Sequence, residues 1–385
     1  MLMTGSLRKI SARKHISLWD NRAGFYVSFL SSALQIMKYL RLLLTPLCAV
    51  ALTTHAVHAT DIKGAGSSAA APLYQKWADA YAKTGAASIE YQSVGSSAGI
   101  KKIKENSVDF GASDVALPAA DLKKSHLIQF PSAVSGVVVV VNLPGYKASE
   151  VHMNGELLAA IFSGRVTQWN DAAITALNPN LHLPAKPIDV VVRQDGSGTT
   201  YNFTDYLCRV SKEWQTAFGK NFTITWNSRL TQVKGSSAIS AAVRKTPFSI
   251  GYIDYNYVVQ DKLDAVQLQN HDGKYLLPTA EGFSAALNNS GWKTQANFEE
   301  MLTDKGGLKS WPITMGTFII LPQAAVSPEK MTATLKFFTW AFMNGDHFVN
   351  SVDLVRLPDA LQARVFKEMM TVTDSKGVPL KWTIQ

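Results

Sequence analysis

The sequence contains little cysteine: only Cys48 and Cys208 occur in 385 residues. Cys48 lies in an apolar stretch near the N-terminus that we expect to be removed during export, and no small residue stands immediately before it, which argues against a lipid anchor. Cys208 would then be alone, which excludes an internal disulfide in the mature chain. We expect Cys208 to act as a small buried apolar side chain.

The sequence also has few charged residues, 17% of the total, and the basic excess is confined to one end. Residues 1–59 carry seven Lys/Arg and one acidic residue, so the remainder carries only about +3 of the net +9. A nucleic-acid-binding protein would need a concentrated basic stripe, and the sequence contains none. We therefore expect no nucleic-acid partner.

No apolar run reaches about 20 residues, the length of a membrane-spanning helix. The run 42–52 is shorter; two basic residues precede it, and small residues follow as far as Ala59. This is the pattern of a secretory signal peptide. We interpret residues 37–59 as a signal peptide and residues 1–36 as an upstream extension, with an uncleaved anchor as the alternative.

Beyond residue 60, short apolar runs alternate with segments of helical periodicity. Segment 72–84 places Leu73, Trp77 and Tyr81 on one helix face, and the β-branched run 134–143 is typical of a strand buried on both faces. The alternation predicts an α/β fold with βαβ units, and the chain length favours two domains or lobes. We expect further strands at 89–91, 108–112, 189–192, 250–255 and 311–321, and further helices at 98–105 and 331–343.

The tetrapeptide Gly-Ser-Ser-Ala occurs at 66–69, 95–98 and 235–238, each time before a helical pattern. The simplest interpretation is that a serine caps each helix. The functional alternative is that the turns bind an anion, because helix N-termini expose unpaired N–H groups and the positive end of the helix dipole.

Three turns could converge on a tetrahedral oxyanion: 66–68, 95–97 and the Gly-Ser-Gly-Thr turn 196–199. Glycine lets the backbone approach closely, and serine or threonine adds a hydroxyl donor. Arg193 precedes the third turn, and its planar guanidinium matches two oxygens of a phosphate. The sequence therefore predicts an anion cradle.

Competing phosphate and hydrolase motifs do not fit the turn at 196–199. A Walker A loop would need a lysine after Gly198, and a dinucleotide fingerprint would need a third glycine three positions further on. A nucleophile elbow would need glycines on both sides of Ser197 at a spacing of two, where Asp195 and Thr199 stand instead.

The sequence offers no metal or cofactor motif either. The histidines of the mature chain are widely scattered, with neither His-x-His nor His-Glu-x-x-His spacing, and no spacing indicates a Ser-His-Asp triad. We expect no catalytic residue, no metal and no cofactor. These histidines are His126, His152, His182, His271 and His347.

Asp114 ends a predicted strand (VDFGASD), where open α/β sheets place their ligands. An ionised carboxylate accepts a hydrogen bond that only a protonated oxyanion can donate. Phosphate is protonated near neutral pH and sulfate is not, so Asp114 would select phosphate by leaving sulfate against an unpaired buried charge. The alternative is that Asp114 is an ordinary helix cap.

The chain from about residue 61 to its end resembles the periplasmic phosphate-binding proteins of bacterial ABC phosphate-uptake systems (the PstS type). The segments that carry the resemblance occur in family order: GAGSSAAAPLYQKWADAY, EYQSVGSSAGIKKI, VDFGASD, QFPSAVSGVVVVVNLPG, FSGRVTQWNDAAITALNP, RQDGSGTTYNFTDYL, IGYIDY and LKFFTWAF. The resemblance implies a two-lobed α/β periplasmic binding protein (Venus-flytrap, type II) with two hinge crossover strands. Lobe I would comprise 60–142 plus 317–385, and lobe II 143–316.

The resemblance also implies which residues contact phosphate. Asp114 would accept the ligand's hydrogen, and Asp195 would steady Arg193 by a salt link. Hydroxyl groups, backbone N–H groups and the guanidinium would supply the remaining contacts. The implied phosphate-binding residues are Ser68, Ala69, Ser96, Asp114, Arg193, Ser197, Gly198 and Thr199.

The function that the resemblance implies is high-affinity phosphate binding in the periplasm and delivery to membrane permease subunits, by a protein that is not an enzyme and acts most simply as a monomer. One alternative is a secreted phosphatase on the same fold, with Ser68 or Ser197 as nucleophile. Another is a receptor for a different tetrahedral oxyanion, such as sulfate.

The sequence departs from the family pattern in the first turn, which usually reads Ala-Thr-Phe-Pro where this chain has Ser67-Ser68-Ala69-Ala70. The hydroxyl and the N–H group survive, but the loss of an aromatic residue and a proline should loosen the loop. The second turn has Ala98 where glycine is usual, and residues 1–36 have no family counterpart.

Overall fold

The computed structural model describes residues 60–295 and 297–382. The predicted upstream extension and signal peptide, at 1–36 and 37–59, lie outside the described residues. Within the described part, none of the helices is long and apolar enough to span a membrane.

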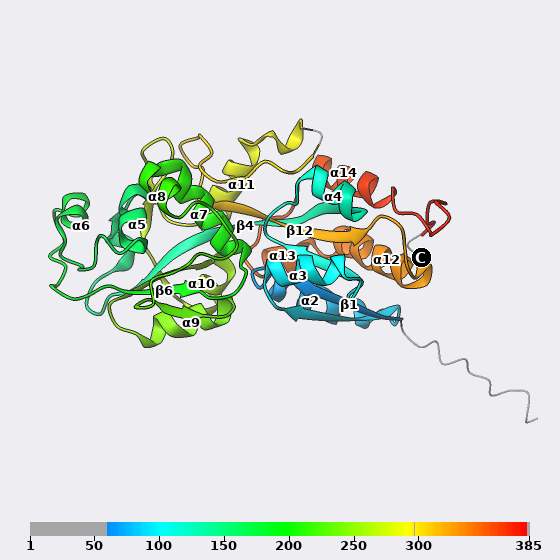
Figure 1. Cartoon of the computed structure of the whole chain (residues 1–385), viewed down its shortest axis with the longest axis horizontal. Helices are drawn as coiled ribbons and strands as arrows, with labels where there is room; N and C mark the ends of the chain where they lie inside the picture. Colours follow the sequence, from blue (N-terminus) through cyan, green and yellow to red (C-terminus); the bar gives the residue numbers. More distant parts are fainter. Residues whose placement is uncertain (1–59, 296, 383–385) are drawn as a thin grey trace, which may run out of the picture. The chain divides into compact units, whose positions relative to one another are not determined.

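Strands and helices alternate along the chain, so the predicted α/β class is confirmed (Figure 1). The strands are β1 (Thr60–Gly66), β2 (Ala87–Ser93), β3 (Phe110–Ser113), β4 (Leu127–Asn142), β5 (His152–Met153), β6 (Asp189–Arg193), β7 (Thr231–Val233), β8 (Ser249–Asp254), β9 (Asp264–Ala265), β10 (Gln267–Gln269), β11 (Tyr275–Leu276) and β12 (Thr314–Pro322). The α-helices are α2 (Ala71–Ala82), α3 (Ser96–Lys104), α4 (Ala119–Ser125), α5 (Gly155–Phe162), α6 (Ala172–Leu177), α7 (Gly198–Val210), α8 (Lys212–Ala217), α9 (Ser236–Lys245), α10 (Tyr255–Asp261), α11 (Ala280–Asn288), α12 (Pro328–Asn344), α13 (Asp346–Asn350) and α14 (Asp359–Met369). Two short 3-10 helices are η1 (Ala148–Glu150) and η2 (Gly291–Lys293).

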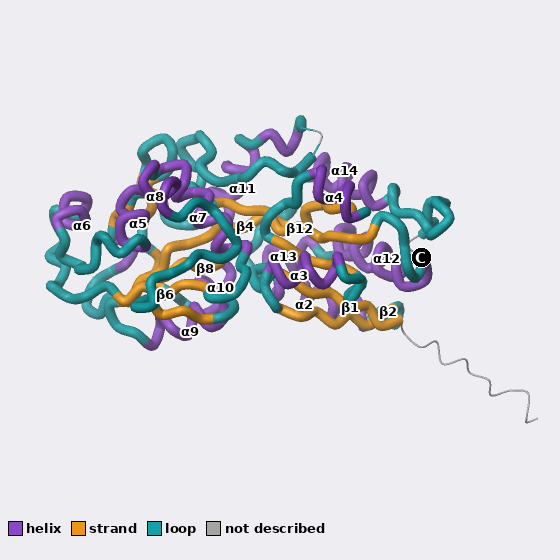
Figure 2. The backbone as a smooth tube through the Cα atoms, viewed as in Figure 1, coloured by secondary structure: helices purple, strands orange, loops and turns teal. Residues whose placement is uncertain are grey.

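One long strand, β4, connects the two halves of the main sheet. The sheet runs in the order β2-β1-β3-β12-β4-β8-β6-β7 within the described residues, and β9 also pairs with β4. The first part of β4 pairs antiparallel with β12 as far as Gly136, and Val137–Asn142 pairs antiparallel with β8. Figures 1 and 2 show β4 and β12 passing between a group of elements that contains β6, α9 and α10 and a group that contains β1, α2 and α12.

The predicted strand at 134–143 begins seven positions earlier than expected, at Leu127. The prediction followed the run of β-branched residues, which starts at Val134. The added part of the strand contains Pro131, which cannot donate a ladder hydrogen bond. The pairing with β12 shifts its register between Thr317 and Phe318, opposite Ala133 and Pro131, and this bulge accommodates the proline.

Smaller corrections concern two strand ends. Tyr255 was predicted in a strand, but β8 ends at Asp254 and Tyr255 begins α10. Trp311 was also predicted in a strand, but it precedes β12, and its indole N–H instead donates to the carbonyl of Val137 at 2.9 Å.

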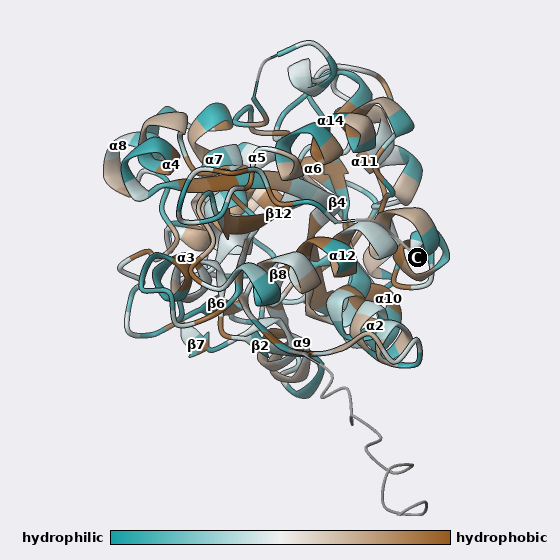
Figure 3. Cartoon of the chain, turned by 90° about the vertical axis from the view of Figure 1, so that its right-hand side faces the viewer, coloured by the Kyte–Doolittle hydropathy of each residue, from teal (hydrophilic) through white to brown (hydrophobic). Residues whose placement is uncertain are grey.

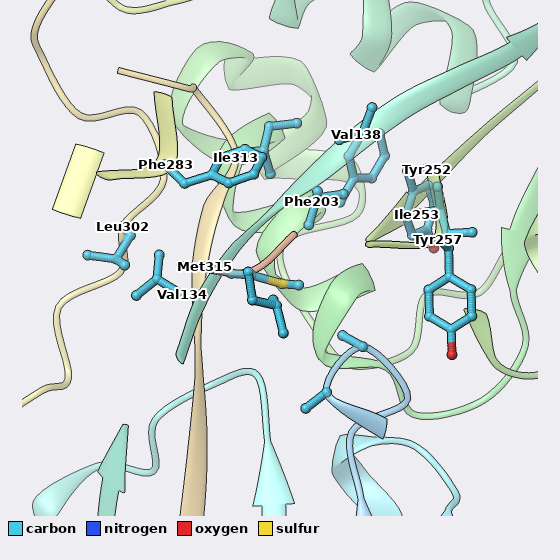
Figure 4. Packing of buried hydrophobic residues seen from close by; sticks show 14 of the residues in the cluster. Val134, Val138, Phe203, Tyr252, Ile253, Tyr257, Phe283, Leu302, Ile313 and Met315 are labelled. Atoms are coloured by element: carbon cyan, nitrogen blue, oxygen red, sulfur yellow. The ribbon is translucent and has the colours of Figure 1, made fainter. Parts of the chain in front are cut away.

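The expected burial of β4 on both faces is confirmed, because every residue from Leu127 to Val141 is buried. Large side chains from distant segments, such as Phe203 and Phe283, pack with Val134 and Val138 in the same core (Figure 4). The apolar colour in Figure 3 is strong on β12, the neighbour of β4. Cys208 is only half-buried, on α7, rather than fully buried as expected.

Helix α3 lies directly on the backbone of β1 and β3 at Gly99. A Cβ atom on Gly99 would meet the Cα of Gly66 at 2.5 Å and the carbonyl oxygens of Ala65 and Ala112 at 2.7 and 2.8 Å. These neighbours are backbone atoms and cannot rotate away. The close approach therefore fixes the N-terminus of α3, including Ser96, against the ends of two strands.

We expect Gly99→Ala to destabilise the protein by about 1–3 kcal/mol, because the added methyl group must push α3 off the sheet. Urea unfolding measures this loss. Gly306→Ala is the matched control, since a Cβ atom there meets its nearest neighbour at 3.8 Å. Equal stability of the two variants would contradict the tight packing at Gly99.

Candidate functional site

The predicted site residues lie where strands end and helices begin. Ser68 and Ala69 follow β1, Ser96 begins α3 and Asp114 follows β3. Arg193 is the last residue of β6, and the turn Ser197, Gly198 and Thr199 leads into α7. All of these residues are buried.

Asp114 lies at the centre of one group of hydroxyls. Its Oδ1 accepts hydrogen bonds from Ser67 Oγ at 2.5 Å and Thr317 Oγ1 at 2.9 Å, and its Oδ2 accepts one from Ser96 Oγ at 3.3 Å. The backbone N–H of Asp114 donates to Ser96 Oγ at 3.1 Å. Asp114 is not a helix cap, because the next helix, α4, begins at Ala119. The capping alternative was therefore wrong.

The third turn meets this group through Gly198. A Cβ atom on Gly198 would approach Ser96 Oγ at 2.5 Å and Asp114 Oδ2 at 2.8 Å. In addition, Asn202 Nδ2 donates to the carbonyl of Asp114 at 2.8 Å. The structure thus brings the start of α7 against Ser96 and Asp114, more than 80 residues away in the sequence.

Arg193 forms the salt link that was expected with Asp195. Its Nε donates to Asp195 Oδ1 at 2.7 Å and its Nη2 to Asp195 Oδ2 at 2.5 Å, while Nη1 donates to Ser236 Oγ at 3.3 Å. Asp195 also accepts the backbone N–H of Gly235 at 3.0 Å. This bidentate pair fixes the plane of the guanidinium.

A second carboxylate, Asp254, organises the other side of the site. Its Oδ1 accepts a hydrogen bond from Thr199 Oγ1 at 2.8 Å, and its Oδ2 accepts one from Ser236 Oγ at 2.5 Å. Ser236 Oγ lies 2.9 Å from Ser68 Oγ as well. Through Ser236, one hydrogen-bonded network joins Ser68, Arg193, Asp254 and Thr199.

Several backbone donors at these turns have no acceptor in the described part of the protein. They are the N–H groups of Ala69, Ser96, Gly198 and Thr199. A buried N–H group normally has a partner, and the first N–H groups of a helix have none within the helix itself. The site is therefore rich in donors for an anion. Ser197 differs, because its Oγ accepts the N–H of Thr200 at 3.1 Å and so caps α7.

The serine-cap interpretation was wrong for all three Gly-Ser-Ser-Ala turns. After the first copy, the N-cap of α2 is Ala70, which makes no side-chain cap bond. The N-caps of α3 and α9 are Gly95 and Gly235, which adopt φ angles of 89° and 80° and make no side-chain cap bond. The serine that follows each glycine is thus free to bond elsewhere. Ser96 bonds Asp114, and Ser236 bonds Asp254.

The first turn is held more firmly than its departures from the family pattern suggested. The carbonyl of Ser67 accepts the hydroxyl of Tyr91 at 2.8 Å, and the carbonyl of Ser68 accepts that of Tyr257 at 3.0 Å. The carbonyl of Ala69 accepts Asn256 Nδ2 at 2.9 Å. Ala69 is itself buried, so side chains from elsewhere hold a loop that lacks the usual aromatic residue and proline.

The electrostatics of the site follow from burial. Burial raises the pKa of Asp114 to about 7, and the negative charge of Asp254 adds to the effect. Burial likewise raises the pKa of Asp254. Burial alone would raise the pKa of Asp195, but the hydrogen bonds and charge of Arg193 outweigh it and lower that pKa below its usual value.

Sequence reasoning placed Ser67 in a predicted cradle turn without giving it a contact, and it missed three further members of the site: Ser236, Asp254 and Thr317. A signal existed for two of them. Ser236 belongs to the third Gly-Ser-Ser-Ala copy, and Asp254 ends a buried strand just before a helix, much as Asp114 follows β3. Thr317 carries no such signal, because its contact with Asp114 joins residues 203 positions apart.

Comparisons with known sequences identify relatives over most of the chain. A family model described as the PBP superfamily domain matches residues 53–344. Phosphate-binding protein PstS from Haemophilus influenzae is 41% identical over 300 residues, which cover 78% of this chain and 90% of the relative. Phosphate-binding protein PstS from Methanocaldococcus jannaschii is 33% identical and covers 71% of this chain and 77% of the relative.

Solved structures share the fold at lower identity. A crystal structure of DING protein matches with a TM-score of 0.66 and 22% identity, covering 84% of this chain and 100% of that one. The phosphate-binding protein from Stenotrophomonas maltophilia matches with a TM-score of 0.63 and 21% identity, covering 80% and 93%. The predicted two-lobed binding-protein fold is therefore confirmed.

Asp114 gives a testable pH dependence of stability. Between its ordinary pKa of 3.8 and about 7, the folded protein retains the proton that the unfolded chain has lost, so the contribution of Asp114 to stability declines as pH rises through this window. Asp114→Asn removes that decline. We expect the variant to gain stability relative to wild type, by a few kcal/mol, between about pH 4 and pH 8 in urea titrations. Asp79→Asn, at an exposed position, is the control, and a constant difference for Asp114→Asn across this range would contradict the assignment.

Proposed function

We propose, because the chain belongs to the PBP superfamily and within it to the PstS phosphate-binding proteins, that it binds inorganic phosphate and delivers it to an ABC phosphate permease. The observation that carries the proposal is a set of buried polar groups that combines unpaired backbone N–H donors, the guanidinium of Arg193 and the acceptor Asp114. Donors match unprotonated oxygens, and the acceptor matches a protonated one.

The arrangement of Arg193 suits a dehydrated anion. Asp195 holds Nε and Nη2, so the guanidinium is oriented before the ligand arrives and loses little freedom on binding. The helix N-termini at Ser96 and Gly198 add partial positive charge without adding a mobile side chain. Ser68 supplies a hydroxyl, and Ala69 and Thr199 supply backbone donors.

The binding residues come from both predicted lobes. Ser68, Ala69, Ser96 and Asp114 belong to the proposed lobe I (60–142 plus 317–385), whereas Arg193 and the turn 197–199 belong to the proposed lobe II (143–316). A ligand that contacts both lobes stabilises the closed state relative to an open one, so binding shifts the population toward closure. The strands β4 and β12 would act as the hinge crossovers.

A binding role, rather than the alternative of a secreted phosphatase, is supported by the surroundings of the two candidate nucleophiles. Ser68 Oγ pairs with another hydroxyl, that of Ser236, and Ser197 Oγ caps its own helix. In the described residues, neither donates to a histidine, lysine or carboxylate that could act as its general base. The relatives described above are named as binding proteins.

Delivery implies an exported protein and membrane partners. We propose a periplasmic location, with residues 37–59 as the export signal, and permease subunits of an ABC phosphate transporter as the partner. A monomer is the simplest form for a carrier that docks on one permease.

We expect Arg193→Ala to weaken phosphate binding at least about a hundredfold, because truncation removes the positive side chain assigned to the site and leaves Asp195 without its ion-pair partner. Isothermal titration calorimetry of ligand-stripped protein measures the change. Arg209→Ala, which breaks the half-exposed ion pair with Asp205, should leave the affinity unchanged. Unaltered binding by Arg193→Ala would remove the basis of the proposed site.

We expect Asp114→Asn to lose selectivity for phosphate over sulfate, because an amide can donate to an unprotonated oxygen where a carboxylate repels it. The same calorimetric titration, run with phosphate and then with sulfate, measures the ratio of the two affinities. Wild type should bind phosphate and give no heat with sulfate. The same ratio of phosphate to sulfate affinity in both proteins would show that Asp114 does not recognise the hydrogen on the ligand.

A further inference from the structure

Ser135, in the middle of β4, carries a buried hydroxyl group that has no partner. Among the described residues, its Oγ atom is the buried side-chain oxygen or nitrogen that makes no hydrogen bond. Leaving a buried hydroxyl unpaired lowers the stability of a protein, and most buried polar side chains are therefore bonded. An unpaired one in the middle of a central strand requires an explanation.

The pairing of β4 with β12 places Ser135 on the face of the sheet that carries the site. Ser135 lies opposite Met315, and residues directly opposite each other in neighbouring strands project to the same face. Thr317, two positions after Met315, also projects to this face, and its Oγ1 bonds Asp114. Figure 4 shows Met315 and Val134 on opposite sides of this pair of strands, as the alternation of side chains requires.

The pairing of β4 with β8 gives the same result from the other edge of the strand. Val137, two positions after Ser135, lies opposite Asp254. The carboxylate of Asp254 accepts hydrogen bonds from Thr199 and Ser236 in the site. Ser135 therefore lies on the strand between the one that carries Thr317 and the one that carries Asp254, and it faces the same way as both.

The spacing on this face explains why Ser135 has no partner in the protein. Thr317 and Asp254 are its diagonal neighbours on the two adjacent strands, and such neighbours lie about 7–8 Å apart. This separation is too long for a direct hydrogen bond, but a tetrahedral ion that is hydrogen-bonded to both sides can span it.

Other hydroxyl groups of the site differ from that of Ser135 because they bond to carboxylates. Thr317 and Ser96 bond to Asp114, and Thr199 bonds to Asp254. The hydrogen and both lone pairs of the Ser135 hydroxyl are uncommitted. It is thus available to donate to an anion without breaking a bond within the protein.

We propose that Ser135 is a further phosphate-binding residue, whose hydroxyl group donates a hydrogen bond to an oxygen of the bound ion from the sheet side of the site. The contact comes from β4, a proposed hinge crossover, whereas the contacts assigned above come from strand ends and turns. The inference rests on the proposed phosphate-binding function and deepens it by adding a donor to the site.

Ser135→Ala tests the proposal in two measurements on ligand-stripped protein. In calorimetric titration with inorganic phosphate, we expect an affinity about tenfold lower than that of wild type, because a hydrogen bond to a charged group is lost. In urea unfolding without phosphate, we expect the variant to be at least as stable as wild type, because alanine removes an unpaired hydroxyl and leaves no partner unsatisfied. The second measurement also shows that the variant is folded.

Ser249→Ala is the matched control. Ser249 is a buried serine on β8, next to β4, and it pairs with Asn142 at the end of β4. Its Oγ donates to the carbonyl of Val243 at 3.2 Å. This variant should lose stability and keep the phosphate affinity of wild type, which is the reverse of the pattern expected for Ser135→Ala.

Two results overturn the inference. Wild-type phosphate affinity in Ser135→Ala would show that the hydroxyl does not contact the ion, as when its partner is a buried water molecule. A loss of ligand-free stability as large as that of Ser249→Ala would show that Ser135 Oγ has a partner within the protein. Absence of phosphate binding by wild type is a different result, because it overturns the proposed function itself and the inference with it.

Discussion

The ladder of hydrogen bonds along β4 is the constraint on which the rest of the molecule depends. It joins β12 on one side to β8 on the other, so every strand that supplies a polar group to the site belongs to one continuous sheet path. Asp114 follows β3, Thr317 lies on β12, Asp254 ends β8 and Arg193 ends β6. The site is thus assembled at strand ends whose mutual register is set by backbone pairing and by a core of β-branched side chains.

Burying the charged groups of the site lowers the free energy of unfolding, and hydrogen bonds within the site offset part of this loss. Two carboxylates and one guanidinium are buried and a third carboxylate, that of Asp195, is partly buried. Desolvation of such groups is offset only by good geometry and complete hydrogen bonding. Asp195 neutralises Arg193 bidentately, and hydroxyl groups solvate Asp114 and Asp254. The unpaired groups are backbone N–H donors, which do not titrate and therefore remain available to an anion at any physiological pH.

The sequence was sufficient to predict local features and insufficient for distant pairings. The α/β alternation, the doubly buried strand and the glycine-rich turns could be predicted because each depends on neighbouring residues. The start of β4 was predicted seven positions late, because the run of β-branched residues begins only at Val134, whereas residues 127–133 belong to the strand through their pairing with β12. For the same reason Thr317 could not be assigned to the site, since nothing near it in the sequence indicates that it contacts Asp114.

The serine turns illustrate a subtler limit. Gly-Ser-Ser-Ala is consistent with helix capping, and only the positive φ angles at Gly95 and Gly235 show that glycine takes the cap position and leaves the serine hydroxyls for other partners. Sequence alone could not distinguish these outcomes. The third copy was therefore left out of the predicted anion cradle, although its serine connects Asp254 with Arg193 and Ser68.

Tyr257, whose hydroxyl donates to the carbonyl of Ser68 in the first turn, also affects the direction of a backbone N–H group. A trans peptide unit points its carbonyl oxygen and its N–H group in opposite directions. Because Tyr257 holds the carbonyl of Ser68, it also sets the direction of the N–H of Ala69, which belongs to the same rigid plane. The hydroxyl of Tyr257 thus sets the direction of the Ala69 N–H group. The side chain at position 69 can therefore be as small as a methyl group without changing that direction.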